Sequence, residues 1–190
     1  MPSAEIVSIG SELLLGQIID TNSAWMSDRL SSLGVDLFYQ STVGDNFDRM
    51  HEVINNALDR SDLVITGGGI GPTQDDITRN VVAKVTKKKL IKSEKLTDEL
   101  KERFHKRGLI LTSNNERQAY IPEGSIIVDN PNGTAPSFIV EDDRGVVICL
   151  PGVPFEMKWL FDNKLIPYIT KKFNLSETII YRVLKLSGIG

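Results

Sequence analysis

Four glycines within five residues, at positions 67, 68, 69 and 71, constrain this chain more than any other feature of its sequence. They follow the short apolar run 63–65, and apolar residues recur after them, over positions 77–85, at helical spacing. This order predicts a strand, a glycine loop and a helix. Glycine permits positive φ and leaves backbone N–H groups uncrowded, so a loop of this kind at the beginning of a helix can hold a phosphate.

Acidic residues follow the glycines directly. Asp75, Asp76 and Thr78 stand at the predicted start of the helix, and carboxylates repel a phosphate unless a cation lies between them. The segment therefore suggests a phosphate ester bound with a divalent metal, which shares its oxygen ligands between carboxylates and phosphates. The same residues also fit a simpler interpretation, a turn followed by a capping box, with Thr73 as N-cap and Asp76 at N3. The loop lacks the Lys-Ser/Thr of a Walker loop.

Composition limits the class of protein. A length of 190 residues with 41% hydrophobic residues fits one domain with a substantial core, and a net charge of −3 gives no electrostatic footprint for nucleic acid. The sequence has neither an export signal at its N-terminus nor an apolar run of about 18 residues, so no membrane span is expected. The one cysteine, Cys149, lies in the apolar run 146–150, which predicts a buried strand residue in a cytoplasmic protein.

Strands and helices alternate in the first half of the chain. Strands are predicted at 6–9, 35–43 and 62–65, with helices between them that begin near Asp20 and near Asp45. This alternation predicts a three-layer α/β domain with a mostly parallel sheet. Four predicted strands end in a glycine segment, at Gly10, at Gly44, at the central loop and at residues 151–154, and in a parallel sheet these ends meet at one edge, where ligands bind.

The second half is less regular. We expect a surface helix capped by Ser93, a short helix within 111–120, a strand at 125–128 and a polar loop at 129–137. A hairpin is expected at 138–150, followed by a helix that opens at Pro154 and that Pro167 interrupts. Residues 178–186 are β-rich. The sequence stops directly after them, which suggests a domain over 1–170 and the start of a following segment over 171–190.

Five segments together resemble the N-terminal domain of the CinA family and, more widely, the molybdopterin-binding fold of MogA and MoaB. They are residues 10–17 with 20–22, 43–45, 66–78, 132–136 and 150–157. The resemblance implies a homodimer that hydrolyses the diphosphate of ADP-ribose to AMP and ribose 5-phosphate with a divalent metal, Mg²⁺ or alternatively Mn²⁺ or Co²⁺. The wider family binds molybdopterin and can activate it by adenylylation, and two aspartates that serve its chemistry map by motif onto Asp45 and Asp76.

Two departures from the family pattern are visible. Ser137 stands where glycine is expected in the Gly-Thr-Ala-Pro-Gly loop, and a side chain there could crowd the ligand. The chain also ends before the region where CinA proteins carry a domain that deamidates nicotinamide mononucleotide, so that activity is expected to be absent.

The candidate site residues follow from these segments. Asp45 and Asp76 are the candidate catalytic residues, and with Asp75 they are the candidate metal ligands. The candidate nucleotide- or phosphate-binding residues are Gly67, Gly68, Gly69, Gly71, Thr78, Asn132, Gly133, Thr134, Gly152 and Glu12. Structural roles stay open for several of them: Asp45 as a helix N-cap, Glu12 as a salt-bridged surface acid, residues 132–134 as a plain turn and Gly152 as a bend.

Three functions remain in view. The first is a metal-dependent ADP-ribose pyrophosphatase, the second a molybdopterin-binding or adenylylating protein, and the third a nucleotide-binding module without catalysis. The expected ligand in the first and third is a small nucleotide. The two histidines, His51 and His105, are expected to be surface or packing residues.

Overall fold

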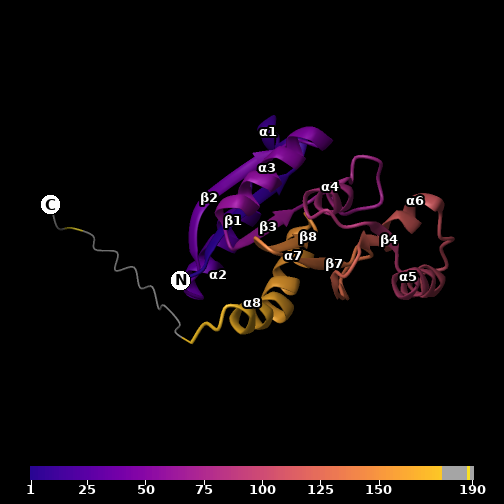
Figure 1. Ribbon diagram of the computed structural model, residues 1–190. Helices are drawn as coiled ribbons and strands as arrows, with labels where there is room; N and C mark the ends of the chain where they lie inside the picture. Colours follow the sequence, from indigo (N-terminus) through magenta and orange to yellow (C-terminus); the bar gives the residue numbers. More distant parts are fainter. Residues whose placement is uncertain (177–187, 189–190) are drawn as a thin grey trace.

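A six-stranded sheet forms the centre of the domain, in a computed structural model that describes residues 1–176 and residue 188. The strands lie in the order β2 (Asp36–Val43), β1 (Ser3–Ile9), β3 (Leu63–Gly67), β8 (Gly145–Leu150), β7 (Ser137–Asp142) and β6 (Ile126–Val128). The first four are parallel, and β7 is antiparallel to both of its neighbours. The predicted mostly parallel sheet is therefore confirmed, and Figure 1 shows its strands side by side.

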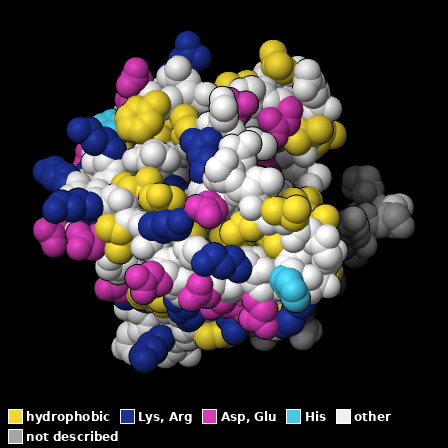
Figure 2. Space-filling model, turned by 90° about the vertical axis from the view of Figure 1, so that its right-hand side faces the viewer, with side chains coloured by type: hydrophobic (Ala, Val, Ile, Leu, Met, Phe, Trp, Pro, Cys, Tyr) yellow, Lys and Arg dark blue, Asp and Glu magenta, His cyan; other side chains and the backbone are white. Residues whose placement is uncertain are grey.

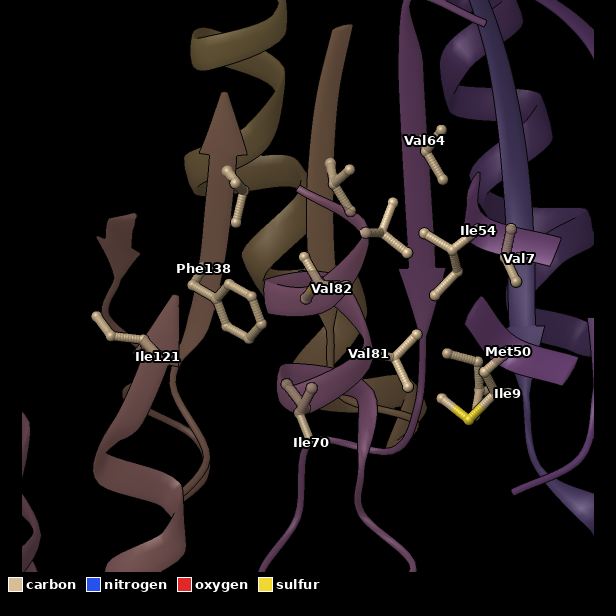
Figure 3. Close-up of a cluster of buried hydrophobic side chains, with 14 of the residues drawn as sticks. Val7, Ile9, Met50, Ile54, Val64, Ile70, Val81, Val82, Ile121 and Phe138 are labelled. Atoms are coloured by element: carbon tan, nitrogen blue, oxygen red, sulfur yellow. The ribbon is translucent and has the colours of Figure 1, made fainter. Parts of the chain in front are cut away.

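Helices cover both faces of this sheet, because successive residues of its apolar strands point to opposite sides. On one face Val7 and Val64 pack with Met50 and Val81, in the cluster drawn in Figure 3. This face is covered by α3 (Phe47–Arg60) and α4 (Thr78–Val85). The other face is covered by α2 (Thr21–Ser32), α7 (Pro154–Leu160) and α8 (Ile166–Lys172). The predicted three-layer α/β architecture is thus confirmed.

Helix ends follow the capping residues of the sequence. The Asp20 carboxylate accepts a hydrogen bond from the Ser23 N–H at 2.9 Å and caps α2, and Gly34, with φ 75°, lies just beyond the end of the same helix. The N-cap of α3 is Asn46, whose side chain accepts from the Arg49 N–H. Asp45 is therefore not the N-cap of α3, which leaves its carboxylate available for another role.

A smaller unit lies beside the sheet and comes from the chain between α4 and β7 (Figure 1). It contains β4 (Leu90–Lys92), α5 (Glu94–Lys106), α6 (Ser113–Glu116), the 3-10 turn η1 (Arg117–Ala119) and β5 (Tyr120–Pro122). Ser93 caps α5 as predicted, whereas the antiparallel pair β4 and β5 was not predicted. Basic and acidic side chains are interspersed on this side of the molecule, as Figure 2 shows.

Pro167 was expected to interrupt the helix that begins at Pro154, but the chain stays helical on both sides of it. The interruption is a π-helical turn, η2 (Phe161–Leu165), which ends two residues before Pro167, and Pro167 removes one backbone donor from this continuous helical segment. The helix continues past residue 170, the expected domain boundary, and Ile169 is fully buried. The β-rich segment predicted at 178–186 lies outside the described residues. None of the helices within the described part is both long and apolar enough to cross a membrane.

Candidate functional site

A cleft of about 460 Å³ lies at the carboxyl ends of the parallel strands. Of the residues predicted from the sequence, those that line it are Glu12, Asp45, Gly68, Gly69, Gly71, Asp75, Asp76, Thr134 and Gly152. Those that do not line it are Gly67, Thr78, Asn132 and Gly133. The structure therefore brings Asp45 and Asp76, which are 31 positions apart in the sequence, to one cleft.

The glycine loop lines this cleft, and part of its backbone carries unpaired N–H groups. Gly68 and Gly69 have φ of 108° and 66°, which L side chains rarely adopt, and a Cβ on Gly68 would overlap the carbonyl oxygen of Ile9. Within the described residues, the N–H groups of Gly69 and Ile70 have no hydrogen-bond partner. Successive unpaired N–H groups on a backbone of this shape form a concave anion-binding surface.

The Asp76 carboxylate closes this loop. It accepts hydrogen bonds from the Gly71 N–H at 2.8 Å, from the Thr73 N–H at 2.8 Å and from the Thr73 hydroxyl at 2.5 Å. The alternative interpretation of Thr73 to Asp76 as a capping box is wrong, because α4 begins only at Thr78 and its N-cap is Ile77. The spacing of Thr73 and Asp76 instead suits a compact turn, in which the Asp76 carboxylate accepts hydrogen bonds from Thr73 and Gly71.

Two buried side chains hold the same loop from below. The Arg79 side chain, only 2% exposed, donates to the carbonyl oxygens of Gly71 and Ile70, and the Thr78 hydroxyl donates to the Gly68 carbonyl at 3.0 Å. Burial lowers the pKa of Arg79 to about 10, so the guanidinium is still charged at neutral pH. Thr78, a predicted ligand contact, therefore lies beneath the loop. The role of Arg79 was not predicted, because an arginine at this place in a predicted helix is normally exposed to solvent.

Asp45 connects the first two strand ends. Its Oδ2 accepts from the N–H and the hydroxyl of Ser11, at 3.0 and 2.9 Å, which fixes the side chain at the cleft. Its Oδ1 forms no hydrogen bond with any described residue, so one carboxylate oxygen is free for a water or a cation. The exposed Glu12 carboxylate lies close to Gly10 on the same side of the cleft.

The opposite wall is organised by Asn130, which is fully buried. Its amide nitrogen donates to the Ala135 carbonyl at 3.0 Å and to Glu156 Oε2 at 2.6 Å, and its amide oxygen accepts from the Asn132 N–H at 3.1 Å. These hydrogen bonds fix the conformation of the turn at 132–134, and Thr134 lines the cleft. Glu156 also lines the cleft and was not among the predicted site residues, although it lies in the recognised segment 150–157.

The bend at Gly152 is fixed from α2. The Asn22 amide donates to the Gly152 carbonyl at 2.8 Å, next to the helix cap formed by Asp20. Burial raises the pKa of Asp20, but hydrogen bonds from Ser8 and Ser23 more than offset this, so the pKa lies below its ordinary value. Residues 20–22 therefore hold the backbone at Gly152, which lines the cleft.

Three further residues lie outside the cleft. Ser137 is fully buried in β7 and does not line the cleft, so the expected crowding of a ligand by its side chain is wrong. Cys149 is fully buried in β8, as predicted, and burial raises the pKa of its thiol to about 12. His51 stacks on Phe47 at a ring distance of 6.5 Å and is half-buried.

Comparison with known proteins identifies the family. The profile of the probable molybdopterin-binding domain (MoCF_biosynth) matches residues 5–171. A crystal structure of CinA from Thermoplasma acidophilum, described as of unknown function, is 33% identical and superposes with a TM-score of 0.80, over 90% of this chain and 97% of that one. The chain belongs to the molybdopterin-binding domain family, in its CinA branch.

Further relatives of this CinA-type domain agree. A competence-damage inducible protein of Caldicellulosiruptor saccharolyticus is 50% identical over 98% of the chain, and one of Halothermothrix orenii is 46% identical over the same share. The chain spans 45% of the length of each, so it matches about half of these curated relatives. The molybdopterin biosynthesis enzyme MoaB of Thermus thermophilus, with 17% identity, 92% and 96% coverage and a TM-score of 0.62, shares the fold.

Proposed function

We propose that this domain hydrolyses the diphosphate of ADP-ribose, with a divalent metal, to AMP and ribose 5-phosphate. The observation that carries the proposal is the composition of one cleft, which is lined by Gly69 and Ile70, whose N–H groups are unpaired among the described residues, and by Asp45, Asp75 and Asp76. The N–H groups suit an anion, whereas the carboxylates repel one. Both kinds of group are satisfied when a cation lies between a phosphate and the acids.

The residues present suit a metal that the substrate helps to hold. Within the described residues, no group of three or more His, Cys, Asp or Glu side chains is arranged to hold a metal ion alone. Mg²⁺ ordinarily takes only one or two carboxylates from a protein and fills its other positions with waters and substrate phosphates. Asp45 offers such a carboxylate, with Asp75 and Asp76 on the same cleft. A bound cation would supply neutralisation of phosphate charge and activation of a water.

The residues of the cleft would bind the phosphates, orient the water and hold the loop in its shape. Water adds to one phosphorus while the bridging P–O bond breaks, and each product leaves with one phosphate. The loop N–H groups hold the phosphate oxygens in place. Asp45, with Oδ1 free, orients the water or the metal, whereas Asp76 holds the loop in its binding shape through three hydrogen bonds.

Release of AMP from ADP-ribose tests this proposal. The reaction is followed by chromatography with Mg²⁺, Mn²⁺ or Co²⁺, and again with a chelator. We expect AMP only with metal, and a loss of at least about 100-fold in kcat/KM in Asp45→Asn. Asp48→Asn is the matched control, because Asp48 is an exposed acid in the first turn of α3 that does not line the cleft. An unchanged rate in Asp45→Asn would remove that residue from the chemistry.

Molybdopterin binding with adenylylation is the second candidate function, favoured by the family match over residues 5–171 and by the fold shared with MoaB. It predicts that molybdopterin binds and becomes adenylylated when ATP is supplied, while ADP-ribose is left intact. Incubation with ADP-ribose alone and with molybdopterin plus ATP therefore separates the two functions. Nucleotide binding without turnover in either mixture would indicate a non-catalytic module.

Self-association as a homodimer is also proposed. Large apolar side chains are exposed in segments that adjoin the cleft residues Glu12 and Glu156 in the sequence, among them Leu15 at 70%, Ile19 at 86% and Phe155 at 68%. A dimer contact would remove such apolar surface from water. Sedimentation equilibrium measures the mass in solution, and we expect twice the chain mass for the native sequence and a smaller mass for Ile19→Glu.

A further inference from the structure

A buried amide, the side chain of Gln118, lines the cleft without full pairing. Gln118 is 1% exposed and lies in η1, within the smaller unit beside the sheet. Its Nε2 is 3.3 Å from the Thr134 hydroxyl, and its Oε1 has no hydrogen-bond partner among the residues that the structure describes. Because the Thr134 hydroxyl can donate or accept, exchanging the two amide atoms also leaves one of them unpaired. A buried polar atom without a partner is costly, so this one calls for a partner that the described residues do not supply.

The position of Gln118 along the cleft follows from the strand order. Asp45 follows β2, the glycine loop follows β3, and Thr134 precedes the antiparallel strand β7 at the same edge. In the order of the strands, β3 lies between β2 on one side and β7 on the other, so the glycine loop lies between the two ends of the cleft. A diphosphate held between the loop and Asp45 can then extend one arm toward Glu12 and the other toward Thr134 and Gln118.

The two ends offer different chemistry. Carboxylates accept hydrogen bonds but do not donate them, which suits the hydroxyl groups of a sugar. A Gln amide carries a donor and an acceptor side by side, which is the arrangement that pairs with the polar edge of adenine. Rotation about the terminal bond of the Gln118 side chain, whose torsional preference is broad, exchanges the positions of Oε1 and Nε2 without a backbone movement, so the amide can offer either atom to a ligand.

We propose that Gln118 determines specificity by reading the nucleobase end of the substrate, with Thr134 fixing its amide. This inference rests on the proposed function, since it assigns the two halves of a nucleotide diphosphate to the two ends of the cleft. The neighbouring Arg117 donates to the Thr73 carbonyl at 3.3 Å, so the same turn also contacts the glycine loop.

Binding of the two product halves tests the inference separately from hydrolysis. Calorimetry gives the dissociation constants of AMP, of ribose 5-phosphate, and of purine riboside 5′-monophosphate, which lacks the 6-amino group. In Gln118→Met we expect AMP to bind about tenfold more weakly, which is the loss of one hydrogen bond, and ribose 5-phosphate to bind as before. The native chain should prefer AMP to the purine analogue about tenfold, and Gln118→Met should not.

Gln40→Met is the matched control, because Gln40 is exposed on β2 and does not line the cleft. Gln118→Glu keeps the shape of the side chain, and retained binding of ribose 5-phosphate by either variant shows that it is folded. If Gln118→Met binds AMP as tightly as the native chain, or loses ribose 5-phosphate equally, Gln118 does not read the base. If the native chain binds no nucleotide, the proposed function falls and this inference falls with it.

Discussion

Replacing Asp76 with asparagine is expected to open the glycine loop locally. The two oxygens of the carboxylate serve different parts of the loop, Oδ1 the Gly71 N–H and Oδ2 the N–H and hydroxyl of Thr73. An asparagine has only one amide oxygen, so an N–H of Gly71 or Thr73 then faces an NH₂ group. The variant also lacks the negative charge that strengthens all three bonds.

The size of the effect follows from these contacts. A hydrogen bond to a charged group contributes about 1.5–3 kcal/mol, and the lower part of this range applies because Asp76 is only half-buried. A loss of about 1.5–2 kcal/mol multiplies the open population of the loop by about 10–30. The effect is local, since Ile70 anchors the loop in the buried cluster on one face of the sheet, whereas the bonds that are lost lie at Gly71 and Thr73, outside that cluster.

Amide hydrogen exchange measures this opening directly, residue by residue. In Asp76→Asn we expect the amides of Gly71 and Thr73 to exchange about 10–30 times faster, while amides in β3 keep their rates. Asp75→Asn is the control, because Asp75 is exposed, lines the same cleft and forms no side-chain hydrogen bond with a described residue. Native exchange rates at both amides in Asp76→Asn would show that this carboxylate does not hold the loop.

Three further predictions concern stability. Ser137→Ala should raise the free energy of unfolding by about 1 kcal/mol, and Tm by about 2–4 °C in thermal denaturation, because the buried Ser137 hydroxyl has no hydrogen-bond partner within the described chain. The lowered pKa of Asp20 means that its ionised form stabilises the fold above pH 3.8 and that this contribution disappears as the pH falls through the folded pKa. The difference in Tm between the native chain and Asp20→Asn should therefore have its largest value at pH 7 and become smaller below pH 3.8. A difference in Tm that does not change with pH would show that the ionised Asp20 does not stabilise the fold. Gly68→Ala should cost about 3 kcal/mol or more in urea denaturation, because of its positive φ and the overlap with Ile9, whereas Gly152→Ala meets only ordinary contact at 3.6 Å and should stay within about 0.5 kcal/mol.

The convergence of distant segments could be predicted from the sequence because it depends on topology alone. Short apolar runs that alternate with amphipathic helices specify a parallel sheet, and each run that ends in glycine marks a strand end at the same edge. Asp45 and the glycine loop therefore come to one cleft whatever their side-chain contacts are. Caps at Asp20 and Ser93 were also predictable, since their signal lies within four residues.

The parts that could not be predicted depend on contacts between segments remote in sequence. Arg79 has the spacing of a solvated helix residue, and only the carbonyl groups of the folded loop account for its burial. Asn130 and Gln118 lie in polar stretches whose burial is decided by the smaller unit closing on the sheet. The role of Thr73 and Asp76 could not be decided from the sequence, because the same spacing suits a capping box and a turn closed by the carboxylate.

The burial of Cys149 makes this domain convenient for site-directed labelling. A thiol that is fully covered and has a pKa near 12 supplies almost no thiolate at neutral pH, so maleimide reagents leave it unmodified in the native fold. It is the only cysteine of the sequence. A fluorophore attached to a cysteine engineered at the exposed position Asp75 would therefore report from the mouth of the cleft against a silent background, without removal of the native residue.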